Sequence, residues 1–181
     1  MQRFLVGLVA LLGLGLGSGG EATAAPKGTL TIGIPTDINT LDPTMGPEVN
    51  SLNVAFSVME PLLFLDAQGN IKPRLAESWE VVDNTTYIFR LRKNVKFHNG
   101  EPFTGHAVEY SWKRSQEKHR ANKTNCSTIS RIDVLDDHTI KVVTEKPDPV
   151  LLKRMANVTC AIFPPKATAA GGDEAASLKP I

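Results

Sequence analysis

The chain has 181 residues, of which 20 are lysine or arginine and 19 are aspartate or glutamate, so its formal net charge is +1. This near-neutral balance gives no support to binding of nucleic acid or of an anionic membrane, both of which attract strongly basic surfaces. A hydrophobic content of 41% is ordinary for a globular protein and argues against intrinsic disorder.

The N-terminal segment has the pattern of a cleaved secretory signal peptide. Arg3 provides a positive charge, residues 4–16 are apolar, and small residues follow up to Ala25. The apolar run is shorter than the roughly 20 residues that a membrane-spanning helix needs, which makes a membrane anchor the weaker alternative. We therefore expect residues 1–25 to be removed on export.

Short strands and helices alternate along the next part of the chain. Residues 29–35 alternate apolar with small or polar side chains and predict a strand, which a loop rich in Asp, Asn, Pro and Gly follows. Residues 48–59 place apolar side chains at helical spacing. The following elements are expected to be a strand over 62–65, a turn over 66–70 and a strand that includes 79–82.

The stretch TYIFRLRKNVKFHNGEPF, residues 86–103, contains several cations and raises the question of a basic binding site. Apolar side chains at the odd positions alternate with Arg90 and Arg92, and successive side chains of a strand point to opposite faces. The cations are therefore expected on a solvated face, and the Asn-Gly pair predicts a tight turn. We expect this stretch to be structural and to contact no ligand.

The second half of the chain continues the mixed pattern. A helix is expected after Thr104, and a hairpin is expected where 131–135 and 139–143 flank a polar turn. Asp148-Pro149 predicts the start of a short helix. The small and polar tail, residues 167–181, is expected to be a loop or linker. Antiparallel strand pairs with a few helices give an α+β fold class.

Two cysteines, Cys126 and Cys160, lie in the mature part of the chain. In an exported protein an even pair favours a disulfide, while two buried free thiols remain the alternative. The four histidines fall in no metal-binding motif, and no phosphate loop, dinucleotide fingerprint or nucleophile elbow is present. We therefore expect no metal, no cofactor and no enzymatic activity.

Several segments, in order, resemble the extracellular solute-binding proteins of family 5, the oligopeptide-, dipeptide- and nickel-binding components of ABC importers. They are TLDP (40–43), MEPLLFLDAQGNIKPRLAESWEV (59–81), TYIFRLRKNVKFHNGEPF (86–103), YSWKR (110–114) and the stretch 132–157. Two departures stand out. Where many members open a helix with Ala-x-Asp-Val, this chain has Gly105-His106-Ala107-Val108. Family members are also much longer.

The resemblance implies a partial periplasmic-binding-protein-like fold. Residues 26–45 would form the first strand and loop of lobe one, and residues 46–181 the extra α+β subdomain of that lobe, truncated before lobe two. The implied function is the monomeric substrate-binding component of an ABC transporter. It would capture short peptides or a related small solute in the periplasm and deliver them to permease subunits. A shortened interaction module, or an inactive fragment, is the alternative.

The resemblance also places the loop after Leu41-Asp42-Pro43 near the ligand cleft. From it, the expected ligand-contacting residues are Met45, Gly46, Asn50 and Ser51. The alternative is that these four are ordinary loop and helix-start residues. The acidic partner that the family uses for a peptide amine has no counterpart in the matched segments.

Overall fold

A computed structural model describes residues 28–29, 31–45, 48–117 and 123–178 of the chain. The contacts of the chain separate residues 1–33 from a compact unit that comprises residues 34–181. The expected signal peptide at residues 1–25 lies outside the described residues. Within the described part of the chain, no helix is long and apolar enough to cross a membrane.

The predicted strand over residues 29–35 is wrong. Its described residues, 29 and 31–35, form no strand, and the side chains of Ile32 and Ile34 are 73% and 42% exposed. A strand is completed only by the N–H and C=O groups of a neighbour, and no described strand pairs with this segment. Alternation of apolar with small or polar side chains is therefore not enough by itself to form a strand in this segment.

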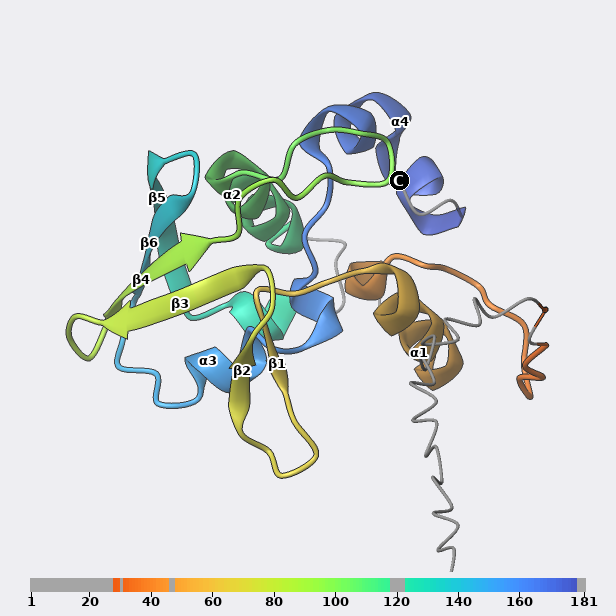
Figure 1. Ribbon diagram of the computed structural model, residues 1–181, viewed down its shortest axis with the longest axis horizontal. Coiled ribbons are helices and arrows are strands. Elements are labelled where there is room, and N and C mark those ends of the chain that lie inside the picture. The colour runs from red at the N-terminus through yellow and green to blue at the C-terminus, as the bar shows by residue number, and fades with distance from the viewer. Residues whose placement is uncertain (1–27, 30, 46–47, 118–122, 179–181) are drawn as a thin grey trace, which may run out of the picture. The chain divides into compact units, whose positions relative to one another are not determined.

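A four-stranded antiparallel sheet lies at one side of the compact unit (Figure 1). Its strands are β3 (Ala76–Val81), β4 (Thr86–Leu91), β5 (Ile129–Asp136) and β6 (Thr139–Thr144), in the order β3-β4-β6-β5. Phe89 of β4 lies opposite Trp79 of β3 and Ile140 of β6. Phe89 and Ile140 are fully buried, so the core lies on this face of the sheet.

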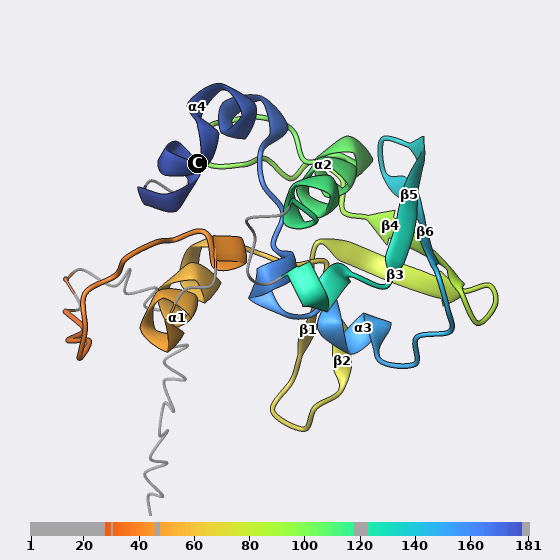
Figure 2. The same cartoon turned by 180° about the vertical axis from the view of Figure 1, so that it is seen from behind.

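The remaining elements lie beside and below this sheet in the view from behind (Figure 2). They are the 3₁₀ turn η1 (Pro43–Met45), α1 (Val49–Val58), the hairpin strands β1 (Leu63–Leu65) and β2 (Ile71–Pro73), α2 (Gly105–Ser115), the 3₁₀ turn η2 (Lys123–Cys126), α3 (Leu151–Arg154), the 3₁₀ turn η3 (Val158–Cys160) and α4 (Pro165–Leu178). Helix α2 packs against β5. The mixture of helices with antiparallel strands confirms the α+β class.

The stretch 86–103 has the structural role that its alternating pattern predicts. Tyr87, Phe89 and Leu91 are buried, whereas Arg90 and Arg92 are exposed. The expected turn forms at Asn-Gly, where Gly100 has a φ of +88° that glycine adopts without steric cost. Arg90 of β4 and Arg92, just beyond its end, thus lie on the solvent side.

Gly105 begins α2 at the point where this helix comes closest to the hairpin of β5 and β6. A Cβ atom at Gly105 would lie 2.8 Å from Cγ2 of Ile140 and 3.0 Å from Cγ1 of Val134. The N–H of Gly105 also donates to the carbonyl oxygen of Asp137 at 2.8 Å. The glycine that departs from the family pattern therefore permits close packing of helix on hairpin.

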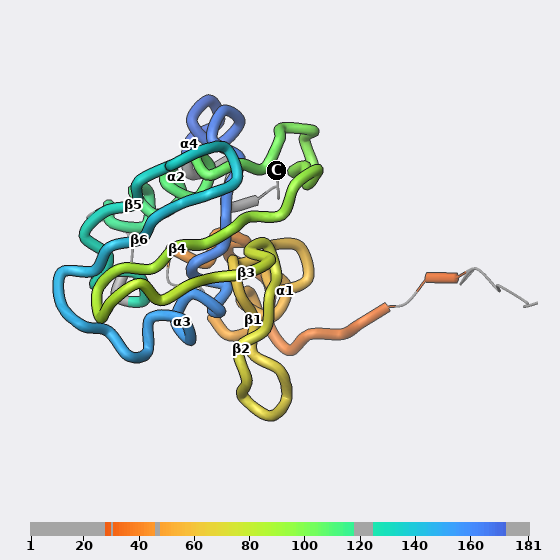
Figure 3. Tube along the Cα trace, turned by 60° about the vertical axis from the view of Figure 1, so that its left-hand side comes forward, coloured from red at the N-terminus to blue at the C-terminus, as the bar shows by residue number. Residues whose placement is uncertain are grey.

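The tail was predicted to be a loop or linker, and this prediction is wrong, because residues 165–178 form helix α4 with a break at Gly172. The connection between β4 and α2 passes beside this helix (Figure 3). From that connection, the carboxylate of Glu101 accepts hydrogen bonds from the N–H groups of Lys166 at 3.1 Å and Ala167 at 2.9 Å. Glu101 thereby pairs two donors that a helix N-terminus leaves without partners.

Acidification is expected to weaken this helix cap. Burial raises the pKa of Glu101, but the hydrogen bond from Ala167, the amide of Asn99 and the Lys166 contacts outweigh it, so the pKa lies below its ordinary value of 4.5. A lowered folded-state pKa means that the stabilisation is present above pH 4.5 and is lost as the pH falls through the folded-state value. Chemical denaturation across this pH range should show the loss.

The variant Glu101→Gln isolates the contribution of this carboxylate. At neutral pH we expect it to lower the free energy of unfolding by about 1 kcal/mol, the usual worth of a helix cap, and to lose less stability than the wild type below pH 4.5. Glu145→Gln, at an exposed site away from α4, serves as the control. Identical pH profiles for wild type and Glu101→Gln would show that Glu101 does not stabilise the fold.

Candidate functional site

The candidate ligand loop comprises residues 36–45 together with the first turn of α1. Two side chains of α1 reach back to this loop. Nδ2 of Asn50 donates to Oγ1 of Thr36 at 2.6 Å, and the hydroxyl of Ser51 donates to Oδ1 of Asn39 at 3.2 Å. These hydrogen bonds join the loop to the start of the helix.

A buried ion pair anchors the middle of the candidate ligand loop. Nη2 of Arg114 in α2 contacts Oδ2 of Asp42 at 2.6 Å, and the side chains are only 4% and 0% exposed. The other oxygen of Asp42 accepts hydrogen bonds from the N–H of Thr44 at 2.9 Å and from its hydroxyl at 2.7 Å. A buried carboxylate needs such partners, because removing a charge from water is costly.

Phe163 completes the surroundings of Arg114. The guanidinium carbon of Arg114 lies 4.5 Å from the centre of the Phe163 ring, a cation–π geometry. The N–H of Phe163 donates to the hydroxyl of Ser111 at 2.8 Å, and this hydroxyl in turn donates to the carbonyl of Ala107 at 2.7 Å. Helix α2 thus contacts both the candidate ligand loop and Phe163 through the face that carries Ser111 and Arg114.

The turn η3 lies beneath the candidate ligand loop and contacts both η1 and α1. Val158 and Ala161 are buried together with Ala55 of α1 in a small core that is distinct from the main core of the sheet. Leu52 and Met59 of α1 pack at its edge. The position of α1 therefore depends on this small core.

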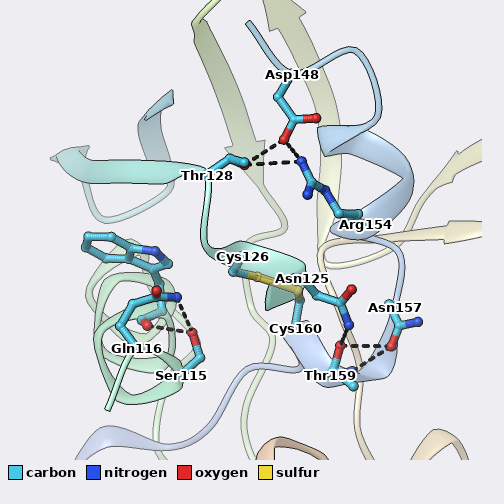
Figure 4. Close-up of a disulfide and its surroundings, with 11 residues drawn as sticks. Ser115, Gln116, Asn125, Cys126, Thr128, Asp148, Arg154, Asn157, Thr159 and Cys160 are labelled. Atoms are coloured by element: carbon cyan, nitrogen blue, oxygen red, sulfur yellow. Dashed lines mark hydrogen bonds and ion pairs between the residues drawn. A yellow bond between two sulfur atoms is a disulfide. The ribbon is translucent and has the colours of Figure 1, made fainter. Parts of the chain in front are cut away.

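Cys126 of η2 and Cys160 of η3 form a disulfide, with their Cα atoms 6.9 Å apart (Figure 4). Above it in the same view, the hydroxyl of Thr128 donates to Oδ2 of Asp148 at 2.6 Å, and Arg154 forms an ion pair with that carboxylate. The predicted start of a helix at Asp148-Pro149 falls two residues early, since α3 begins at Leu151. Asp148 still bonds the N–H of Val150 at 3.2 Å.

The expected ligand-contacting residues differ in their accessibility. Met45 ends η1 with 39% of its surface exposed, and Asn50 is partly exposed near the start of α1. Ser51 is 1% exposed, and its hydroxyl supports the loop through Asn39. Gly46 lies outside the described residues. Met45, Asn50 and Ser51 therefore lie in one region of the structure, but they differ in their exposure to solvent.

Sequence reasoning did not identify the Asp42–Arg114 pair, although both residues belong to the segments that carry the resemblance. A local signal was present for Arg114. It follows Ala107 by seven residues and Ser111 by three, so it lies on the same buried face of α2. A cation on the buried face of a helix requires an anion. Which anion it contacts, 72 residues away, could not be read from spacing.

A separate cavity of about 260 Å³ lies beside the C-terminal end of α1. Its lining includes Phe56, Phe97 and His98, and the Nε2 atom of His98 lies 3.2 Å from the carbonyl oxygen of Val58. Of the expected ligand-contacting residues that the structure describes, Met45, Asn50 and Ser51, none lines this cavity. The cavity and the candidate ligand loop are therefore different features of the unit.

Comparison with known proteins places the chain in a family. The family model described as bacterial extracellular solute-binding proteins, family 5 Middle, matches residues 70–181. The chain is 30% identical to the periplasmic oligopeptide-binding protein OppA of Salmonella typhimurium over 169 residues, which cover 83% of this chain and 31% of that protein. It thus spans about a third of the length of the curated relatives that it matches first.

Solved structures agree with this match. OppA of Burkholderia pseudomallei aligns with a TM-score of 0.74 and 25% identity, covering 82% of this chain and 33% of that one. OppA of Haemophilus influenzae, in complex with the peptide RPPGFSPFR, aligns with a TM-score of 0.70 and 26% identity, covering 76% and 31%. The chain belongs to the bacterial extracellular solute-binding proteins of family 5.

Proposed function

We propose that this protein is the substrate-binding component of an ABC importer, which captures short peptides or a related small solute in the periplasm for delivery to permease subunits. The observation that carries this proposal is the family match over residues 70–181. The relatives named above are peptide-binding proteins, and one solved structure holds a peptide. In this role the protein makes and breaks no covalent bond of its solute.

We propose the candidate ligand loop as the part of this chain that contacts the solute. Met45 offers an exposed apolar side chain, and Asn50 offers a partly exposed amide. An extended peptide presents both main-chain hydrogen-bonding groups and side chains, so it can use both kinds of contact. The hydroxyl of Ser51 holds Asn39 of the same loop through a hydrogen bond. Gly46 stays a predicted contact.

A rigid anchor beneath the candidate ligand loop fits this role. Solute capture by hinge closure requires contact residues that are already placed when the lobes meet, because ordering them on binding would cost affinity. The Asp42–Arg114 pair places the loop against α2. Because the chain spans about a third of its relatives, we expect it to supply a fraction of the contacts of a complete site.

A nuclear magnetic resonance titration of the ¹⁵N-labelled chain with trialanine tests the proposed function. We expect amide shifts concentrated in residues 36–51, at peptide concentrations well above micromolar. Asn50→Ala should reduce these shifts, while Asn84→Ala, in an exposed turn, should leave them unchanged. Shifts centred on the cavity at Phe97 and His98, or no shifts up to millimolar peptide, would contradict the assignment of the site.

A further inference from the structure

The Cys126–Cys160 disulfide joins two 3₁₀ turns, η2 and η3, that are far apart in the chain. The cysteines are 34 residues apart, and Cys126 is 6% exposed. Each turn comprises only three or four residues. Such short turns make too few internal hydrogen bonds to hold themselves in place, so their positions are decided by tertiary links.

A polar link accompanies the disulfide and joins the residues that precede the two cysteines, Asn125 and Thr159 (Figure 4). Nδ2 of Asn125 donates to the hydroxyl of Thr159 at 2.6 Å. Oδ1 of Asn157 accepts hydrogen bonds from the N–H of Thr159 at 3.0 Å and from its hydroxyl at 2.9 Å, which caps η3. The described links between η2 and η3 are therefore one covalent bond and one side-chain hydrogen bond.

The position of η3 affects the two elements that it contacts, α1 and η1. Val158 of η3 is fully buried, with 0% of its surface exposed to solvent. It packs with Ala55 of α1 in the small core. The same turn contacts η1, which ends at Met45. The small core contains few residues, so it cannot hold α1 firmly if η3 shifts.

We propose that the Cys126–Cys160 disulfide is a redox-dependent positioning element for the candidate ligand loop. When the bond is formed, η3 is fixed and supports η1 and α1. When a dithiol reduces the bond, η3 loses its covalent link and the candidate ligand loop loosens while the sheet remains folded. The relevance of this effect to solute capture rests on the proposed function, whereas the structural effect itself does not.

The chemistry of the switch is thiol–disulfide exchange. On oxidation, the thiols of Cys126 and Cys160 lose two protons and two electrons in total, and the Sγ–Sγ bond forms. A second disulfide, supplied by a thiol oxidant, accepts the electrons and becomes a dithiol. Disulfides persist in oxidising compartments and are rare in the cytosol. The bond, and with it the ordering of the candidate ligand loop, is therefore expected to persist in an oxidising compartment.

The sheet has its own support and should not follow the loop. Its buried residues Phe89, Ile140 and Val142 pack together in the main core, and strands β4 and β6 pair directly. The Asp148 carboxylate also connects Thr128, the residue before β5, to Arg154 of α3 without using the disulfide. Reduction is therefore expected to act locally.

Hydrogen–deuterium exchange of the full 181-residue chain tests this proposal in the absence of any solute. The oxidised wild type is compared with the wild type in dithiothreitol, which ends as its own cyclic disulfide, and with Cys126→Ser/Cys160→Ser. We expect the amides of residues 49–58 to exchange about tenfold faster or more after reduction, while those of β4 and β6 change by less than about twofold.

Asn125→Ala provides the matched control, because it removes the polar link and leaves the disulfide in place. It should accelerate exchange in residues 49–58 less than reduction does. Unchanged protection of α1 after reduction overturns the proposal. Equal loss of protection in α1 and in the sheet also overturns it, since the bond is then a staple of the whole fold. Neither result bears on the titration with trialanine, so this inference and the proposed function can fail separately.

Discussion

Replacement of Arg114 by methionine is expected to lower the free energy of unfolding by about 3–5 kcal/mol, the range measured when one partner of a buried ion pair is removed. The Asp42 carboxylate is fully buried and contacts the Arg114 guanidinium at 2.6 Å. Methionine keeps the apolar stem of the side chain and removes the cation, together with its contact to Phe163. Denaturant-induced unfolding measures the loss.

Two further variants make this result specific. Arg131→Met removes a cation whose ion pair with Asp133 is largely exposed, so it should cost at most about 1 kcal/mol. The double variant Asp42→Asn/Arg114→Met should be more stable than Arg114→Met alone, because no charge is then left buried. A loss below about 1 kcal/mol for Arg114→Met would show that the pair does not anchor the candidate ligand loop.

Replacement of Phe89 by alanine is expected to lower the free energy of unfolding by about 3–5 kcal/mol. Phe89 is 0% exposed in the central strand β4, between Trp79 and Ile140 of the neighbouring strands. Alanine would leave a cavity that rigid neighbours on both sides cannot fill. Thermal and denaturant unfolding, followed by circular dichroism, measure this loss.

Phe56→Ala is the matched control for Phe89→Ala. Phe56 is 48% exposed on α1, so its truncation should cost about 1 kcal/mol, in proportion to the smaller area that it buries. If the two variants lost equal stability, the sheet would not be the main source of stability of the compact unit.

Local patterns predicted those elements whose structure depends on neighbours in sequence. The alternation at Tyr87, Phe89 and Leu91 correctly indicated the buried face of β4, and the polar turn between β5 and β6 indicated their hairpin. Residues 48–59 likewise correctly indicated α1. In each case one buried face and one exposed face suffice to specify the element.

Features that depend on distant partners were not predictable in this way. Helix α4 contains small residues and a glycine pair, and its N-terminus is capped by Glu101, some 65 residues earlier in the chain. The segment 29–35 has the alternation of a strand but no described strand pairs with it. The sequence could not decide whether Cys126 and Cys160 form a disulfide or remain free thiols. In the structure they form a disulfide.

In the candidate site too, the sequence indicated some features, whereas others became visible only in the structure. The resemblance directed attention to Met45, Asn50 and Ser51, but it did not indicate which of them is accessible. Burial answered this question, since Ser51 is 1% exposed and Met45 is 39% exposed. The Asp42–Arg114 anchor joins a loop to a helix, and only the folded chain brings the two residues together.

Peptide binding by a chimera is the decisive measurement for the proposed solute contacts. In it, residues 34–178 of this chain replace the aligned segment of Salmonella typhimurium OppA, and calorimetry measures the affinity for a short peptide. We predict that the chimera binds the peptide and that Met45→Ala/Asn50→Ala weakens binding by about tenfold, which corresponds to about 1.4 kcal/mol. A folded chimera that binds no peptide, or one that the double substitution leaves unchanged, would contradict this prediction.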